Sequence, residues 1–508
     1  MPAPATPAGA LRRGGTLLLH IPESPTLWPF VGSLANQIAH QFIYSQLTRY
    51  SPGRFQPIPD LAESWTPSPD ATRWTFKLRR GVTWHDGAPF TSEDVRFSLD
   101  VYRNPATGTS LRPYLAPIVS VEARDPHEAV IATDSPMSSL PELLAFHCPM
   151  LPRHRLEGRE LGKPDATFTR APVGTGPFKF IEHRAGMRLA LAANESFYLG
   201  RPRVDGVTLF VINVQSAALS RLRSGELHVA LIAPNQIDAI RHSFDIAVEE
   251  IPQTDVRLFG GNHRHPRTGR LFGEPAVRRA ISHAIDRPRL VENVTRGRAA
   301  LAAGPVPAIL QPWVNPSVDP VQFDPEKASR LLAEAGFKPG TGGILQRDRE
   351  PLSFSFMGEL GAGDREQAGL LIQRQLRDVG IDARPELHPF DTFMERWRVR
   401  RDFEAANWYY VTPPTADLAL HWTTDAPLNE WGYSNPEVDR LCAAGRSELD
   451  PEKRRATFHK VQEILAQDQP VAHLYWPAEL RAVSNKVRGL PQLPYRFLGS
   501  ALHEVSVG

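Results

Sequence analysis

Segments with a strand-like period and segments with a helix-like period alternate along this chain of 508 residues. "TLLLHI" (16–21) is a compact apolar run, typical of a buried strand, and "RWTFKLRRGVTW" (73–84) alternates apolar and polar residues. Apolar residues at helical spacing follow in "EPAVRRAISHAIDR" (274–287) and "REQAGLLIQRQLRDVGI" (365–381). This alternation predicts an α/β fold.

Composition narrows the class of protein further. The chain contains 48 prolines spread along its length, which argues against a coiled coil or a helical repeat. Lys and Arg number 58 against 56 Asp and Glu, and a net charge of +2 gives no reason to expect nucleic acid or an anionic membrane as a partner. No apolar run approaches the roughly 18 residues of a membrane span.

The stretch "WHDGAPFTSEDV" (84–95) places His85 and Asp86 beside a tryptophan, just before a predicted helix. Asp-Gly is a strong turn dipeptide, and Thr91 with Asp94 forms a variant of the capping box. The helix that follows has one apolar stripe, formed by Val95, Leu99 and Tyr102. We interpret the stretch as scaffold. The rival hypothesis is a secreted hydrolase that uses His85 and Asp86.

Other motifs that could carry chemistry are incomplete. "VGTGPF" (173–178) lacks the Lys and Ser/Thr of a phosphate loop and predicts a tight turn. His263 and His265 have no visible further ligands for a metal, so we expect neither a metal nor a cofactor. Cys148 and Cys442 lack metal-ligand or redox spacing, which favours two buried thiols and leaves a long-range disulfide as the alternative.

The segment "NWYYVTPPTADLALHW" (407–422) is the best candidate for ligand contact. Trp408, Tyr409 and Tyr410 precede a Pro-Pro break, and in a strand they alternate between faces. An aromatic wall with a polar rim suits a cleft for small organic molecules. The alternative is that each ring packs in the core of a buried strand.

Five stretches, taken in order, resemble one family, the peptide/nickel class (family 5) of extracytoplasmic solute-binding proteins that feed ABC importers. They are "PDLAESWTPSPDATRWTFKLRRGVTWHDGAPFTSEDV" (59–95), "VGTGPFKF" (173–180), "VRRAISHAIDR" (277–287), "DPEKASRLLAEAGF" (324–337) and "YSNPEVDRL" (433–441).

The resemblance implies a two-lobed periplasmic-binding-protein fold with hinge crossings and an extra domain in the first lobe. The expected division is lobe one in 11–55, 172–257 and 485–508, the extra domain in 56–171, and lobe two in 258–484. It also implies a monomeric, non-catalytic periplasmic protein that closes on its solute and docks on an ABC permease in the inner membrane. "MPAPATPAGALRRGG" at the start would then follow a removed signal peptide.

The resemblance also identifies candidate binding residues. Peptide binders of the family carry an Asp three residues after the tryptophan that matches Trp408, where this chain has Val411. Some dipeptide binders carry an Arg where an approximate alignment places Glu359. Each missing charge partner costs roughly 2–5 kcal/mol, which disfavours a zwitterionic dipeptide. The solute would be a blocked or larger peptide, an opine-like or sugar conjugate, or a metal chelate.

The predicted ligand-binding residues are Trp408, Tyr409, Tyr410, Val411, Glu359, Asn36, Ser33 and Asn262. Trp408 and Tyr410 are expected to supply stacking surface, and Glu359 a charge for a cationic or polyhydroxylated group. Asn36 and Asn262 are expected either to orient the ligand through hydrogen bonds or to serve packing.

Overall fold

The computed structural model describes residues 13–51, 55–146, 148–411, 414–415 and 417–508. The chain divides into two compact units, Met1–Ile251 with Glu479–Gly508, and Pro252–Ala478. It therefore passes between the units twice, within β12 (Ile246–Pro252) and within β21 (Ala472–Ser484). The predicted two-lobed α/β fold with repeated crossings is confirmed. The finer five-segment division stays a prediction, and the predicted N-terminal tail up to Arg12 lies outside the described residues.

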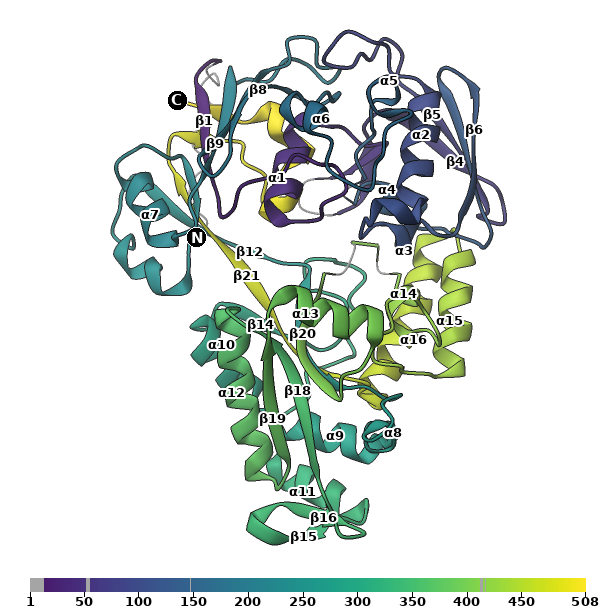
Figure 1. Ribbon diagram of the computed structural model, residues 1–508, viewed down its shortest axis with the longest axis vertical. Helices are drawn as coiled ribbons and strands as arrows, with labels where there is room; N and C mark the ends of the chain where they lie inside the picture. The colour runs from purple at the N-terminus through teal and green to yellow at the C-terminus, as the bar shows by residue number, and fades with distance from the viewer. Residues whose placement is uncertain (1–12, 52–54, 147, 412–413, 416) are drawn as a thin grey trace. The chain divides into compact units, whose positions relative to one another are not determined.

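The main sheet of the first unit has β1 (Thr16–Ile21) at its centre, hydrogen-bonded in parallel to β10 (Gly206–Val211) and β11 (Val229–Leu231). β9 (Arg188–Ala193) and β8 (Phe178–Arg184) extend it antiparallel. A separate sheet has the order β4 (Ala62–Pro67), β5 (Arg73–Leu78), β7 (Glu128–Thr133), β6 (Ile118–Asp125). Figure 1 shows the two sheets at opposite sides of the first unit. The remaining strands are β2 (Thr48–Tyr50), β3 (Pro57–Pro59), β22 (Val487–Arg488) and β23 (Ser506–Val507).

The helices of the first unit are mostly short. They are α1 (Leu34–Ile43), α2 (Ser92–Arg103), α3 (Arg112–Leu115), α4 (Leu140–Leu144), α5 (Arg153–Leu156), α6 (Ala166–Arg170) and α7 (Gln215–Arg223), with the 3-10 segments η1 (Pro105–Thr107), η2 (Pro234–Ala239) and η5 (Tyr495–Glu504). α2 begins with the predicted capping box of Thr91 and Asp94, and its predicted apolar stripe is buried.

The stretch containing His85 binds the "VGTGPF" turn 90 residues away. The His85 N–H donates to the Gly174 carbonyl at 2.8 Å, the ring Nδ1 accepts from the Gly174 N–H at 3.3 Å, and Nε2 donates to the Gly176 carbonyl at 3.0 Å. Burial lowers the pKa of His85 to about 4, so the ring is neutral at pH 7. Both ring nitrogens of His85 are used within the molecule, as the scaffold interpretation expects.

The two glycines of this turn are required for close approach. A Cβ at Gly174 would lie 1.9 Å from the Ile43 carbonyl oxygen, and a Cβ at Gly176 would lie 2.5 Å from the Ile43 carbonyl carbon. A side chain at either position would displace the end of α1. "VGTGPF" therefore joins α1 to the loop of His85.

The sheet of the second unit has the order β19 (Asp382–His388), β18 (Ser353–Glu359), β20 (Ala405–Val411), β13 (Asp255–Gly261), β21. β18 is parallel to both β19 and β20, whereas β13 is antiparallel to β20. The other strands are β14 (Ala299–Leu301), β15 (Lys338–Pro339), β16 (Leu345–Arg347) and β17 (Glu350–Pro351).

The predicted helices of the second unit are confirmed. The described helices are α8 (Gly269–Gly273), α9 (Pro275–Ala284), α10 (Arg287–Thr295), α11 (Pro325–Glu334), α12 (Gly363–Asp378), α13 (Phe390–Met394), α14 (Ala419–Trp422), α15 (Pro436–Ser447) and α16 (Pro451–Asp468), with η3 (Thr341–Gly343) and η4 (Glu395–Arg400). α9 and α12 share one hydrophobic core with β18, through side chains such as Ile281, Ile372 and Phe356. Within the described part of the chain, no helix is both long and apolar enough to cross a membrane.

Candidate functional site

The candidate site lies where parallel strands end. In open α/β sheets, ligands bind at the carboxyl ends of the strands. In the second unit, β18 and β20 run parallel and end at Glu359 and Val411. In the first unit, β1 ends at Ile21 and continues into the loop 22–33. Five of the eight sequence-predicted residues, Glu359 and residues 408–411, lie at the ends of β18 and β20.

Two arginine side chains lie close to the ring of Tyr409. The guanidinium carbon of Arg365 lies 4.9 Å from the ring centroid and that of Arg257 lies 5.2 Å from it. Arg257 is held by Asp364 at 3.1 Å and by Asp255 at 3.3 Å. Contacts of this kind between a guanidinium and an aromatic face are attractive. Tyr409 is partly exposed, so the edge presents an aromatic ring beside two guanidinium groups that carboxylates hold in place.

The neighbouring rings point into the unit. Trp408 is 4% exposed and stacks on Phe393, with ring centroids 4.1 Å apart and an interplanar angle of 24°. Tyr410 is 6% exposed, and its hydroxyl donates to the Glu430 carboxylate at 3.2 Å. The expectation that Trp408 and Tyr410 supply stacking surface therefore needs correction. These two rings support the strand from inside, and Tyr409 is the one of the three that stays partly exposed.

Glu359 forms an ion pair with Arg365, whose guanidinium donates to its carboxylate. The predicted free charge at Glu359 is thus balanced within the unit. Sequence reasoning missed Arg365, although one signal was present. Arg365 lies in the first turn of α12, where a positive charge opposes the helix dipole, so another interaction must hold it there.

Val411 ends β20 and is paired in register with Asp255 of β13. The Asp255 carboxylate is itself bound by Arg257. Val411 therefore contributes no charge, and its nearest acidic neighbour across the strands is already balanced. Residues 412, 413 and 416 of the following predicted break, including the first proline of Pro413-Pro414, lie outside the described residues.

Asn262 lies at the wrong end of the sheet for the predicted site. It follows Gly261, which pairs with Ala405 at the start of β20, whereas Val411 is at its end. Six steps along a strand correspond to about 20 Å. The Asn262 amide donates to the Arg401 carbonyl at 3.1 Å and accepts from the Arg264 N–H at 3.0 Å. Asn262 is therefore removed from the proposed ligand contacts, and its role is to order the loop that follows β13.

Ser33 and Asn36 lie at the start of α1 in the first unit. Ser33 is the N-cap, and its hydroxyl accepts from the Asn36 N–H at 3.3 Å. Asn36 is fully buried, and both N–H groups of its amide are used inside the molecule. Of the two alternatives for Asn36, the structure therefore favours packing.

The histidines and cysteines considered as metal ligands or redox groups are hydrogen-bonded or buried within the protein. His263 Nε2 donates to the Pro470 carbonyl at 3.2 Å, and His265 Nδ1 accepts from the Thr268 N–H at 3.4 Å. Cys148 and Cys442 are buried free thiols, and burial raises the pKa of Cys148 to about 12. Among the residues that the structure describes, no three His, Cys, Asp or Glu side chains gather as metal ligands.

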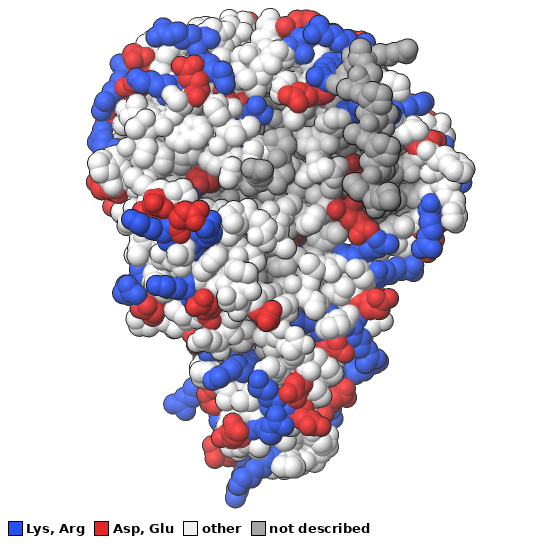
Figure 2. All heavy atoms as spheres, turned by 180° about the vertical axis from the view of Figure 1, so that it is seen from behind, with Lys and Arg blue, Asp and Glu red and all other residues white. Residues whose placement is uncertain are grey.

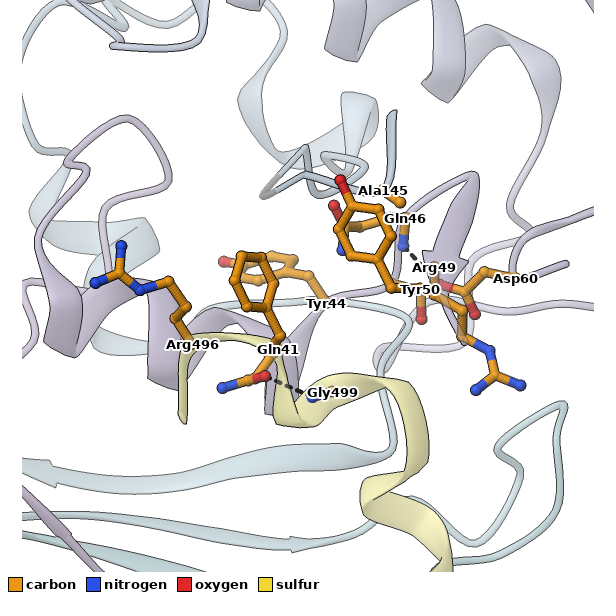
Figure 3. A pocket seen from close by; sticks show the side chains of 11 residues that line it. Gln41, Tyr44, Gln46, Arg49, Tyr50, Asp60, Ala145, Arg496 and Gly499 are labelled. Atoms are coloured by element: carbon orange, nitrogen blue, oxygen red, sulfur yellow. Dashed lines mark hydrogen bonds between the residues drawn. The ribbon is translucent and has the colours of Figure 1, made fainter. Parts of the chain in front are cut away.

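A small polar cavity in the first unit lies between the end of α1, β2 and η5 (Figure 3). Its volume of about 50 Å³ has room for about three to five water molecules. The Asp60 carboxylate in its wall already accepts from the Gln46 N–H at 2.9 Å and the Tyr198 hydroxyl at 2.5 Å. The cavity is too small for a peptide.

On the face of the molecule seen in Figure 2, the described charged side chains give no sign of a polyanionic partner. On the face shown in Figure 2, Lys and Arg are interspersed with Asp and Glu, and no large area carries one sign. This distribution agrees with the small net charge.

The fold and the two strand-end edges define the class of bilobal α/β binding proteins. Residues 56–430 match the family described as "Bacterial extracellular solute-binding proteins, family 5 Middle", and the chain belongs to this family. A Brucella abortus protein, provisionally named an ABC transporter peptide-binding protein, is 36% identical over 457 residues, which cover 86% of this chain and 82% of that protein. The oligopeptide-binding protein AppA of Bacillus subtilis is 26% identical over 503 residues, covering 97% and 91%.

Solved structures show the same fold. The structure of Bacillus subtilis AppA in complex with a nonapeptide has a TM-score of 0.82 at 24% identity and covers 98% of this chain and 100% of that one. The binding protein AgaA from A. tumefaciens R10, in complex with agropinic acid, has a TM-score of 0.81 at 22% identity, covering 97% and 99%.

Proposed function

We propose that this protein is the periplasmic solute receptor of an ABC importer, that it captures a peptide or peptide-like solute without chemical change, and that it passes the solute to an inner-membrane permease. The relatives named for peptide binding support the solute class. The observation that carries the proposal is the edge around Tyr409, where two arginines are held by carboxylates beside a partly exposed ring. Such an arrangement binds without offering a nucleophile or a free base.

The ligand contacts proposed at this edge are Tyr409, Val411, Arg365 and Glu359, and in the first unit the loop 22–33 with Ser33. Val411 places an apolar side chain where a charge would be needed to fix an α-amine. A peptide longer than two residues, or one with blocked ends, therefore fits better than a zwitterionic dipeptide.

A second candidate is a non-peptide solute such as an opine conjugate or a nickel chelate. It is favoured by the same uncharged Val411, and AgaA shows the fold with agropinic acid bound. The two candidates differ in which compounds should stabilise the protein.

The test uses the purified full chain, freed of co-purifying solute and incubated with a tryptic digest of casein. We expect mass spectrometry to detect retained peptides longer than two residues, and we expect small-angle scattering to show a smaller radius of gyration on saturation, because a closed form contacts the solute on both sides. Retention of no peptide, together with a raised melting temperature in agropinic acid or nickel–histidine, would favour the second candidate. A monomer is expected throughout.

Replacing Tyr409 with alanine should weaken retention of the casein peptides about ten-fold or more. Loss of a stacking ring costs roughly 1–3 kcal/mol. Tyr409→Phe keeps the ring beside Arg257 and Arg365 and should bind like the wild type. Equal affinity of the alanine variant and the wild type, measured by calorimetry with one retained peptide, would remove Tyr409 from the site.

A further inference from the structure

The loop 22–33 contains a leucine in a left-handed conformation. Leu27 has a φ of 60° although its side chain is fully buried. A leucine rarely adopts this region, and it persists only where the surroundings impose it. Strained backbone of this kind gathers at binding sites, and this loop directly follows the carboxyl end of β1.

The side chain of Asn36 imposes the conformation. Its Oδ1 accepts from the Leu27 N–H at 3.1 Å, and its Nδ2 donates to the Thr26 hydroxyl at 2.9 Å and to the Val31 carbonyl at 3.1 Å. One buried amide thus joins both arms of the loop to the first turn of α1. Ser33 caps the same turn and so fixes where the helix that carries Asn36 begins.

Aromatic contacts anchor the inner side of the loop. Trp28 packs edge-on against Phe30 at 5.2 Å and against Phe168 at 6.1 Å, and Phe30 packs against Tyr102 at 5.7 Å. The side chains left exposed are those of Glu23, Thr26 and Val31. The loop therefore presents a fixed outer surface although it contains no regular secondary structure.

We infer that Asn36 is a positioning residue for solute binding: it does not touch the solute, and it holds the loop 22–33 in the strained form that does. This inference rests on the proposed function. A preorganised loop loses little freedom on binding, so releasing it should weaken binding even though no contact group has been removed.

The test compares Asn36→Ala with Asn315→Ala. Asn315 is a matched control, since its amide is also buried and also makes three bonds, to the His459 carbonyl, the Glu463 carboxylate and the Ser317 N–H. Amide hydrogen exchange and retention of casein peptides are measured for both variants below their melting temperatures. Asn36→Asp, which keeps the acceptor for Leu27, serves if the alanine variant does not fold.

We expect Asn36→Ala to exchange the amides of residues 22–33 at least ten-fold faster and to retain about ten-fold less peptide, while Asn315→Ala matches the wild type in both readouts; Asn36→Asp should fall in between. If the Asn36 variants exchange their loop amides and retain peptide as the wild type does, the inference is overturned. Faster loop exchange with unchanged retention would also overturn it, because binding would then not depend on the loop. If the wild-type protein itself retains no peptide, the proposed function fails. In that case amide exchange still tests the role of Asn36: exchange of residues 22–33 in Asn36→Ala as slow as in the wild type would overturn the positioning role separately.

Discussion

Lowering the pH from 7 to 4.5 should destabilise the second unit by several kcal/mol. His421 and His473 are buried there, and His263 is half-buried. Burial lowers the pKa of His263 to about 4 and the pKa of His421 and of His473 to about 3, against 6.5 in an unfolded chain. Between these values the unfolded state binds more protons, so the free energy of unfolding is highest above pH 6.5 and falls as the pH decreases. Three such groups give a slope of up to about 4 kcal/mol per pH unit.

Denaturant titrations at pH 7.0, 5.5 and 4.5, followed by tryptophan fluorescence, measure this slope. His473→Phe should remove about one third of it, since one of the three titrating groups is then absent. His242→Gln changes an exposed histidine and should leave the slope unaltered. A stability that stays constant or increases between pH 7 and 4.5 would contradict the assignment.

Replacing Arg287 with methionine should destabilise the second unit by about 3–5 kcal/mol. Arg287 is 1% exposed and donates to the carbonyls of Ser282 at 2.7 Å and His473 at 2.6 Å, and also to the Ser282 hydroxyl at 2.7 Å. Burial lowers its pKa to about 10, so it remains charged at pH 7. Methionine fills a similar volume but leaves these buried acceptors without a donor.

The control is Arg289→Met, because Arg289 is exposed two residues further along α10. It should change the free energy of unfolding by less than about 0.5 kcal/mol, as surface substitutions usually do. Urea unfolding at pH 7 gives both values. A loss below about 1 kcal/mol for Arg287→Met would show that these carbonyls find other partners.

The predicted ligand edge at residues 408–411 stays a prediction, and the structure places Asn262 at the opposite end of the same strand pair. The segment of Trp408 to Val411 was found because three aromatics in a row are unusual, and strand alternation predicts that their side chains point both ways. Which ring stays exposed depends on Phe393 and on Glu430, and neither contact follows from the local pattern. Asn262 was misplaced because the antiparallel register of β13 and β20 is a pairing of segments about 150 residues apart.

The contacts of His85 also divide into local ones, which the sequence predicts, and contacts with distant segments, which it does not. Its turn and the capping box after it are made by neighbours within four residues, so the sequence predicts them. Its partners Gly174 and Gly176 are distant in the chain, and only the folded unit brings them within hydrogen-bonding distance.

Local patterns in the sequence predicted several helices and strands, the family resemblance and the scaffold role of the "WHDGAPF" stretch, because hydrophobic period, capping and turn chemistry act between close neighbours. Packing in the folded chain brings Arg365 to Glu359, places two arginines close to the Tyr409 ring, and joins the Asn36 amide to the left-handed Leu27. These features depend on strand order, on register and on the direction of buried side chains. They arise when distant segments pack, and no local pattern encodes which atoms then meet.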